Sequence, residues 1–213
     1  MSIIEIKERQ GDSLEYSIFE ECFKLLEKPI GFTCEIGVRD GFGSTVIIDA
    51  WRKIHGQRPL VHLGIDPFGN IEYNGSDKLM NVKYDYTNQM KQDMLTYMSY
   101  HYPEFNFINL EDSEFFEKFK DGYPIYNEHK MKINHYDLVH LDGPHDTENI
   151  IKEANFFMDR APNQQFIVMD DCQTYDLIKI EEHCKTRKFN LVYEGERKAV
   201  FSNFSVDKST VDK

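Results

Sequence analysis

Apolar runs of strand length that end in acidic residues constrain the fold of this chain more than any other feature. Residues 136–141 lead into Asp142, and residues 166–169 lead into Asp170 and Asp171. Parallel strands bring their carboxyl ends to one edge of an open α/β sheet, where such sheets place their sites. We therefore expect the three acids to meet at one edge, where their oxygen atoms would suit a hard metal ion.

Helix-like segments alternate with the strand-like runs. The segments that read as helices are 14–26, 44–55, 86–100, 113–119, 147–159 and 175–187, and the strand-like runs are 32–36, 60–65, 105–110, 136–141, 166–169, 190–193 and 199–201. The last two runs flank a turn-like segment, 194–198, and predict a hairpin. The pattern predicts a Rossmann-like, doubly wound α/β fold with a mostly parallel, seven-stranded sheet and an antiparallel C-terminal hairpin.

The length of 213 residues, 40% of them hydrophobic, suits one globular domain. We expect this domain to span residues 1–204, followed by a flexible polar tail at 205–213. Segments 70–86 and 122–134 are longer than simple connections need. Their tyrosines could line a substrate pocket or pack surface loops; they are Tyr73, Tyr84, Tyr86, Tyr123 and Tyr126.

The net charge indicates which class of binding partner the protein has. The chain has 25 Lys and Arg against 37 Asp and Glu, a net charge of -12, which disfavours nucleic acid and favours a small molecule. The 4 cysteines lack CxxC spacing, which indicates a reducing, cytoplasmic location. No stretch approaches the roughly 20 apolar residues of a membrane span, so we expect a soluble protein without a membrane partner. The N-terminal helix and the edge hairpin could support a homo-oligomer.

A glycine-rich turn follows the first strand-like run. The segment from Glu35 to Gly43 has the form ExGxxxGxG and lacks the GxGxxG spacing of a dinucleotide fold. Glycines at Gly37 and Gly41 would let the backbone approach a ligand closely. The acid before the turn suits a ligand with cationic or hydroxyl groups, and S-adenosylmethionine has both.

From residue 32 to residue 201, this arrangement resembles the class I S-adenosylmethionine-dependent methyltransferases. The resemblance implies cofactor binding by Glu35, Gly37, Gly41, Gly43 and Ser44 at the methionine part, by Asp66 at the ribose, and by Asp112 and Ser113 at the adenine. Each assignment has a structural alternative. Gly41 and Gly43 could relieve a tight turn, Asp66 before a proline could form a turn, and Asp112 with Ser113 could cap a helix.

The acids and a histidine resemble a narrower group. The segment from Leu141 to His145, with Asp170 and Asp171, resembles the divalent-metal-dependent O-methyltransferases, in the branch of macrolide-sugar O-methyltransferases and cephalosporin-hydroxylase-like proteins. The resemblance implies that Asp142, Asp170 and Asp171 bind Mg2+ and that His145 is the catalytic base. Two features depart from the pattern: residues 161–165 replace a Pro-Gly-Gly turn, and Gly43 stands where relatives often have Ser.

The chemistry agrees with these residue types. A hydroxyl attacks a sulfonium methyl slowly unless it is deprotonated, and a hard dication held by carboxylates stabilises the oxyanion. We therefore predict an O-methyltransferase that acts on a small hydroxylated substrate. Two other functions stay open: a different metal-assisted reaction, such as hydroxylation, and a non-catalytic binding or scaffold protein. Asp170 and Asp171 could also simply cap the next segment, and His140 is expected to be a packed, hydrogen-bonded core residue.

Overall fold

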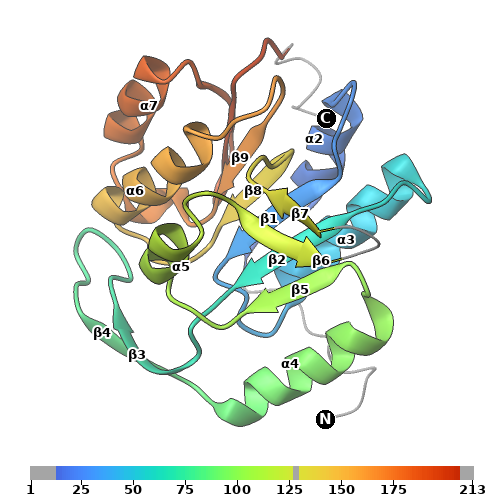
Figure 1. Cartoon of the computed structure of the whole chain (residues 1–213). Coiled ribbons are helices and arrows are strands. Elements are labelled where there is room, and N and C mark those ends of the chain that lie inside the picture. The colour runs from blue at the N-terminus through green and yellow to red at the C-terminus, as the bar shows by residue number, and fades with distance from the viewer. Residues whose placement is uncertain (1–12, 127–129, 207–213) are drawn as a thin grey trace.

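A seven-stranded sheet forms the centre of the protein (Figure 1). The computed structural model describes residues 13–126 and 130–206. The strands are β1 (Phe32–Ile36), β2 (Val61–Ile65), β5 (Phe105–Ile108), β8 (Leu138–Leu141), β9 (Phe166–Met169), β10 (Asn190–Glu194) and β11 (Ala199–Ser202), in the order β10-β11-β9-β8-β1-β2-β5. Strand β11 is antiparallel to both neighbours, whereas the pairs among β5, β2, β1, β8 and β9 are parallel. The predicted sheet with its antiparallel C-terminal hairpin is confirmed.

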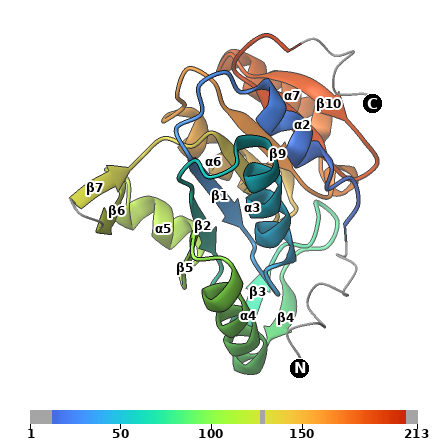
Figure 2. The ribbon, with the colours of Figure 1, turned by 90° about the vertical axis from the view of Figure 1, so that its right-hand side faces the viewer.

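Helices cover both faces of the sheet, as Figures 1 and 2 show. One layer contains α2 (Ile18–Leu25), α3 (Phe42–His55) and α4 (Asn88–His101), and the other contains α5 (Asp112–Lys118), α6 (Thr147–Met158) and α7 (Leu177–Thr186). A short 3-10 helix, η1 (Cys172–Thr174), follows β9. No helix within the described ranges is long and apolar enough to cross a membrane.

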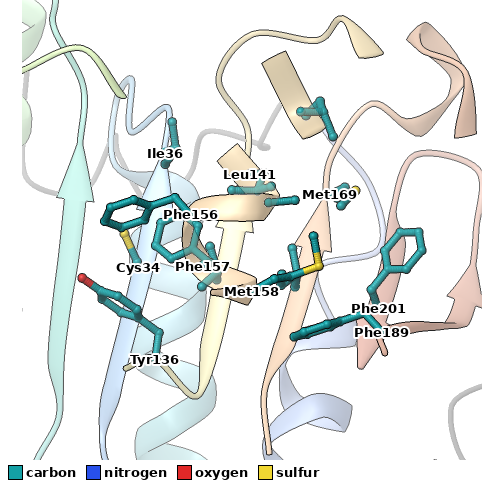
Figure 3. Packing of buried hydrophobic residues seen from close by; sticks show 14 of the residues in the cluster. Cys34, Ile36, Tyr136, Leu141, Phe156, Phe157, Met158, Met169, Phe189 and Phe201 are labelled. Atoms are coloured by element: carbon teal, nitrogen blue, oxygen red, sulfur yellow. The ribbon is translucent and has the colours of Figure 1, made fainter. Parts of the chain in front are cut away.

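The central strands are buried on both faces. Every residue of β8 and β9 is buried, as expected for parallel strands between two helical layers. Figure 3 shows Phe156 and Phe157 of α6 packed beside the strand residues Cys34, Ile36 and Leu141. Fully burying an apolar side chain of this size stabilises the fold by about 1.5–3 kcal/mol. This core holds the strand ends in fixed positions.

Two small hairpins lie outside the main sheet. They are β3 (Gly69–Tyr73) with β4 (Val82–Tyr86), and β6 (Tyr123–Tyr126) with β7 (Lys130–Ile133). The extra length predicted for segments 70–86 and 122–134 therefore forms hairpins, which were not predicted from the sequence. These strands have only four or five residues each and mix apolar or aromatic residues with polar ones, glycine or proline, so they lack the continuous apolar signal of a central strand. Figure 2 shows the β6–β7 hairpin projecting to one side of the molecule.

The domain boundary stays a prediction. Most of the predicted tail, residues 207–213, lies outside the described residues, and so do residues 1–12.

Candidate functional site

A cavity of about 720 Å3 opens at the carboxyl ends of the parallel strands. Acids from four strands line it: Glu35 in β1, Asp66 after β2, Asp142 after β8 and Asp170 after β9. The strand order reverses at β1, which lies between β2 and β8, and this is the position where doubly wound folds bind ligands. The volume is in the usual range for a small-molecule site.

The β3–β4 hairpin forms one wall of this cavity. Its lining side chains include Ile71, Tyr73, Tyr84 and Tyr86. The rings of Tyr73 and Tyr84 stack with centroids 4.3 Å apart, and the hydroxyl oxygens of Tyr73 and Tyr86 lie 3.0 Å apart. Of the five predicted pocket tyrosines, these three line the cavity, whereas Tyr123 and Tyr126 belong to the β6–β7 hairpin and are not among its lining residues.

The structure brings His145 together with two of the predicted acids. Its Nε2 atom lies 3.9 Å from Oδ1 of Asp142 and 3.6 Å from Oδ2 of Asp171. The backbone N–H of His145 donates to the carbonyl of Asn74 at 3.0 Å, which fixes the residue against the β3–β4 loop. Burial lowers the pKa of His145 more than the nearby Asp171 raises it. The imidazole is therefore neutral at neutral pH and able to accept a proton.

Asp171 has an unusual backbone conformation. Its φ of 52° and ψ of 38° lie in the left-handed region, which a non-glycine residue occupies at a cost of about 1–3 kcal/mol. Its side chain forms an ion pair with Arg197 from the β10–β11 turn. Such strain persists where the surrounding structure enforces it, and Asp171 is one of the residues that line the cavity.

Asp170 differs from Asp142 and Asp171 because both oxygens of its carboxylate are engaged by protein groups. It accepts hydrogen bonds from Lys198 Nζ at 2.7 Å and from Ser13 Oγ at 2.6 Å, as well as from the backbone N–H of Asp171 at 2.8 Å. Burial alone would raise the pKa of Asp170, but His140 and Lys198 together push it below its ordinary value. The predicted role of Asp170 as a metal ligand stays a prediction that these contacts do not favour.

Glu35 belongs to a buried hydrogen-bond network. Its carboxylate accepts from Ser44 Oγ and, at 2.8 Å, from His140 Nδ1, while His62 Nε2 lies 3.0 Å from Ser44 Oγ. His140 is thus the packed, hydrogen-bonded residue that was predicted. Ser44 is fully buried and is not among the cavity-lining residues. Its predicted contact with a ligand stays untested, and its observed partners are protein groups.

Local contacts and backbone angles explain why glycine occupies three positions of the turn. A Cβ atom at Gly37 would overlap the carbonyl of Asp142, and one at Gly43 would overlap the Glu35 carboxylate. Gly41 has a φ of 85° and is the N-cap of α3. The observations at Gly41 and Gly43 support the structural alternative for these two glycines, and Gly37 also has a structural reason. Gly37 and Gly43 also line the cavity, whereas Gly41 is not among its lining residues.

Asp66 lines the cavity and also shapes a turn. Its two carboxylate oxygens accept from the backbone N–H groups of Arg39 and Phe68, both at 2.8 Å. Burial raises the pKa of Asp66 despite these hydrogen bonds. Each carboxylate oxygen can accept more than one hydrogen bond, so the turn role leaves capacity for a ligand.

Asp112 and Ser113 lie at the start of α5 and line the cavity. The N-cap of this helix is Glu111, which forms a capping box with Glu114. The helix begins one residue earlier than predicted, and the alternative that Asp112 with Ser113 acts as its cap was wrong. Their side chains are not needed for capping.

Sequence reasoning missed the two cations of the β10–β11 turn. Arg197 and Lys198 were read only as turn residues, yet β11 pairs with β9 so that Ala199 lies opposite Met169. This register brings Arg197 and Lys198 to the acids after β9. An antiparallel strand that starts opposite the end of a parallel strand was the signal that could have revealed them.

One group of donor atoms within the described ranges is compact enough for a metal ion. The ligand atoms of Glu35, His140 and Asp142 lie within 4.8 Å of one another. His140 Nδ1 and Glu35 Oε1 are hydrogen-bonded to each other, whereas the buried Nε2 atom of His140 has no hydrogen-bond partner among the described residues. The carboxylates of Asp142 and Asp171 are more accessible, with side-chain exposures of 26% and 19%.

No family model matches the chain, and no curated protein matches it. Among solved structures, the chain is similar to the O-methyltransferase NovP, with a TM-score of 0.59 and 15% identity over 89% of this chain and 79% of that one. This chain has the Rossmann-like methyltransferase fold.

Two further structures share this methyltransferase fold. A putative caffeoyl-CoA O-methyltransferase from Staphylococcus aureus has a TM-score of 0.57 and 12% identity, over 95% of this chain and 91% of that chain. The O-methyltransferase TomG from Streptomyces achromogenes, solved in complex with SAM, has a TM-score of 0.56 and 9% identity, over 94% of this chain and 86% of that chain.

Proposed function

We propose that this protein is an S-adenosylmethionine-dependent O-methyltransferase that acts on a hydroxyl group of a small molecule. One observation carries the proposal: a single cavity joins the acids Glu35, Asp66 and Asp112 to the pair of Asp142 and His145. The first three acids suit the ammonium, ribose hydroxyl and adenine amine groups of the cofactor. The fold, shared with structures of O-methyltransferases, supports the same function.

A divalent metal such as Mg2+ fits the hard oxygen donors that line the cavity at Asp142 and at Asp171. The Oδ1 atom of Asp171 is paired with Arg197, while its Oδ2 atom lies towards His145. Mg2+ commonly uses only one or two protein carboxylates and retains several waters. Bound there, it would stabilise the negative charge that develops on the acceptor oxygen. We leave Asp170 out of this proposed ligand set because Lys198 and Ser13 occupy its carboxylate.

His145 is the proposed base. In the reaction, the methyl carbon leaves the sulfonium sulfur and bonds to the acceptor oxygen, while the hydroxyl proton moves to Nε2 of His145. The neutral imidazole is the form that this role requires. The nearby carboxylates of Asp142 and Asp171 would then stabilise the imidazolium that forms.

The test is methyl transfer to a panel of small hydroxylated compounds, followed by product mass. A gain of one CH2 supports the proposal, whereas a gain of one oxygen would instead support hydroxylation. His145→Ala should lower kcat by about 10²–10⁴-fold and leave S-adenosylmethionine affinity within about twofold in calorimetry. An unchanged kcat would remove His145 from the mechanism. Cytoplasmic location and a homo-oligomeric state stay predictions.

A further inference from the structure

Glu153 in α6 differs from the other buried acids of the described ranges because no protein group donates a hydrogen bond to it. It is fully buried, and neither carboxyl oxygen accepts a hydrogen bond from a donor group of the protein. The other buried acids each accept at least two hydrogen bonds; they are Glu35, Asp66, Asp137, Asp146 and Asp170. A buried polar group without a partner costs about 1–3 kcal/mol. A residue that bears this cost within a packed helix calls for an explanation.

The Glu153 carboxyl lies directly behind the cavity wall. Its Oε1 atom is 3.3 Å from the position that a Cβ atom on Gly143 would occupy, and Gly143 lines the cavity. Asp112, which also lines the cavity, has its side chain within hydrogen-bonding reach of the Glu153 carboxyl. Asn149, one helical turn earlier on α6, lines the same cavity.

The surroundings of Glu153 favour its neutral form. Burial raises its pKa well above the ordinary value, and Asp112 of α5, Asp146 at the start of α6 and Asp142 after β8 raise it further. Burial, Glu35 and Glu153 raise the pKa of the Cys34 thiol in β1. A neutral carboxyl has one O–H donor, which an ionised carboxylate lacks. Asp112 offers the acceptor for this donor.

We propose that Glu153 is a positioning residue whose carboxyl group donates a hydrogen bond to Asp112, holding the Asp112 carboxylate as the acceptor for the exocyclic amine of a purine ring. The inference rests on the proposed function, because the purine is the adenine of the proposed cofactor. Asp112 has two oxygens, so one can accept from Glu153 while the other faces the cavity. Glu153 itself does not contact the ligand.

The first test compares two probes, S-adenosylhomocysteine and its inosine analogue, in which a carbonyl replaces the exocyclic amine. The protein should bind the adenosine compound at least about tenfold more tightly, as expected for one hydrogen bond to a charged acceptor. Glu153→Gln, which keeps a donor of the same shape, should retain this ratio. Glu153→Met, which has no donor, should reduce it to below about threefold. Full discrimination in Glu153→Met, or equal loss in both variants, would overturn the proposal.

The second test needs no ligand. The folded pKa of Glu153 is raised, so the buried carboxyl costs no stability through ionisation below its unfolded pKa of 4.5. This loss of stability grows as the pH rises above 4.5. The Tm of Glu153→Gln, relative to the Tm of the unaltered protein, should therefore rise as the pH increases from 4 to 8. Glu148→Gln, at an exposed position of the same helix, should show no such trend. A constant Tm difference for Glu153→Gln would show that Glu153 is not a buried donor.

The two tests separate the possible failures. If neither probe binds while the Tm difference still grows with pH, the proposed function fails, and the purine role fails with it, but the buried donor stands. If the adenosine probe binds with the expected preference in every variant, the proposed cofactor stands and the role of Glu153 is overturned.

Discussion

At the scale of single residues, the pair of Lys198 and Asp170 is the most unusual feature. Both side chains are essentially unexposed, at 0% and 1%, and their charged atoms lie 2.7 Å apart. Ser13 bonds to both members, at 2.8 Å to Lys198 Nζ and 2.6 Å to Asp170 Oδ1. Desolvating two charges is expensive, so such a pair adds little net stability, but leaving one member alone is costly. The arrangement fixes the start of β11 to the end of β9.

We expect Lys198→Met to destabilise the protein by about 3–5 kcal/mol, because it leaves Asp170 buried without its cation. Urea unfolding measures this loss. Lys185→Met is the matched control: Lys185 pairs with Glu181 at 2.7 Å on the surface, and its removal should cost less than about 1 kcal/mol. In a double-mutant cycle, Lys198→Met combined with Asp170→Asn should recover part of the loss. Equal losses at Lys198 and Lys185 would contradict the prediction.

At the scale of elements, the central strands were predictable from sequence and the small hairpins were not. Strands β8 and β9 are short apolar runs followed by Asp142 and by Asp170 with Asp171, so both their type and the edge where they end follow from composition. In β3 and β4, side chains alternate between partly buried and exposed positions over only five residues each. A pattern this short is also compatible with a polar loop. Only the folded structure shows that the tyrosines of this hairpin line the same cavity.

The candidate site was likewise only partly predictable from the sequence. Strand order placed Asp142, His145 and Asp171 together, as predicted from their positions after neighbouring strands. The engagement of Asp170 with Lys198 depends on the register of β11 against β9, which no local pattern specifies. The cap of α5 was assigned to the wrong residues for a local reason, because Glu111 forms a capping box with Glu114, three residues later.

Asp77 anchors the β3–β4 hairpin to two helices. Its carboxylate accepts from the backbone N–H and the hydroxyl of Thr147, both at 2.7 Å, and from the N–H of Asp176 at 3.2 Å. Loss of a cap of this kind typically costs about 1 kcal/mol. We expect Asp77→Ala to speed hydrogen exchange in β3 and β4 by about fivefold. Asp85→Ala, at an exposed position of the same hairpin, should not.

The effect of Asp77 should depend on pH. Burial alone would raise its pKa, but the hydrogen bonds from Thr147 lower it below the ordinary value of 3.8. The stabilisation is therefore complete above pH 3.8 and is lost as the pH falls through the folded pKa. The exchange difference between the unaltered protein and Asp77→Ala should shrink accordingly in acid. An unchanged difference would mean that the carboxylate is not the anchor.

At the scale of the whole molecule, the net charge of -12 complicates any test for a specific metal site. Divalent cations screen general repulsion between acids, so Mg2+ could stabilise the protein without binding at one place. The proposed site differs from this background because its carboxylates, Asp142 and Asp171, come from two neighbouring strands and face one cavity. Its contribution should therefore depend on those two residues alone.

We expect Mg2+ at ten times its Kd to stabilise the protein by about 1.4 kcal/mol, a rise in Tm of about 3–5 °C. Asp142→Asn or Asp171→Asn should abolish this rise at constant ionic strength, with NaCl replacing MgCl2 in the reference. Asp121→Asn, an exposed acid that is not among the cavity-lining residues, removes the same charge and should keep it. A rise that survives both site variants would place the metal elsewhere. A rise that only the site variants remove would assign the metal to the edge where β8 and β9 end.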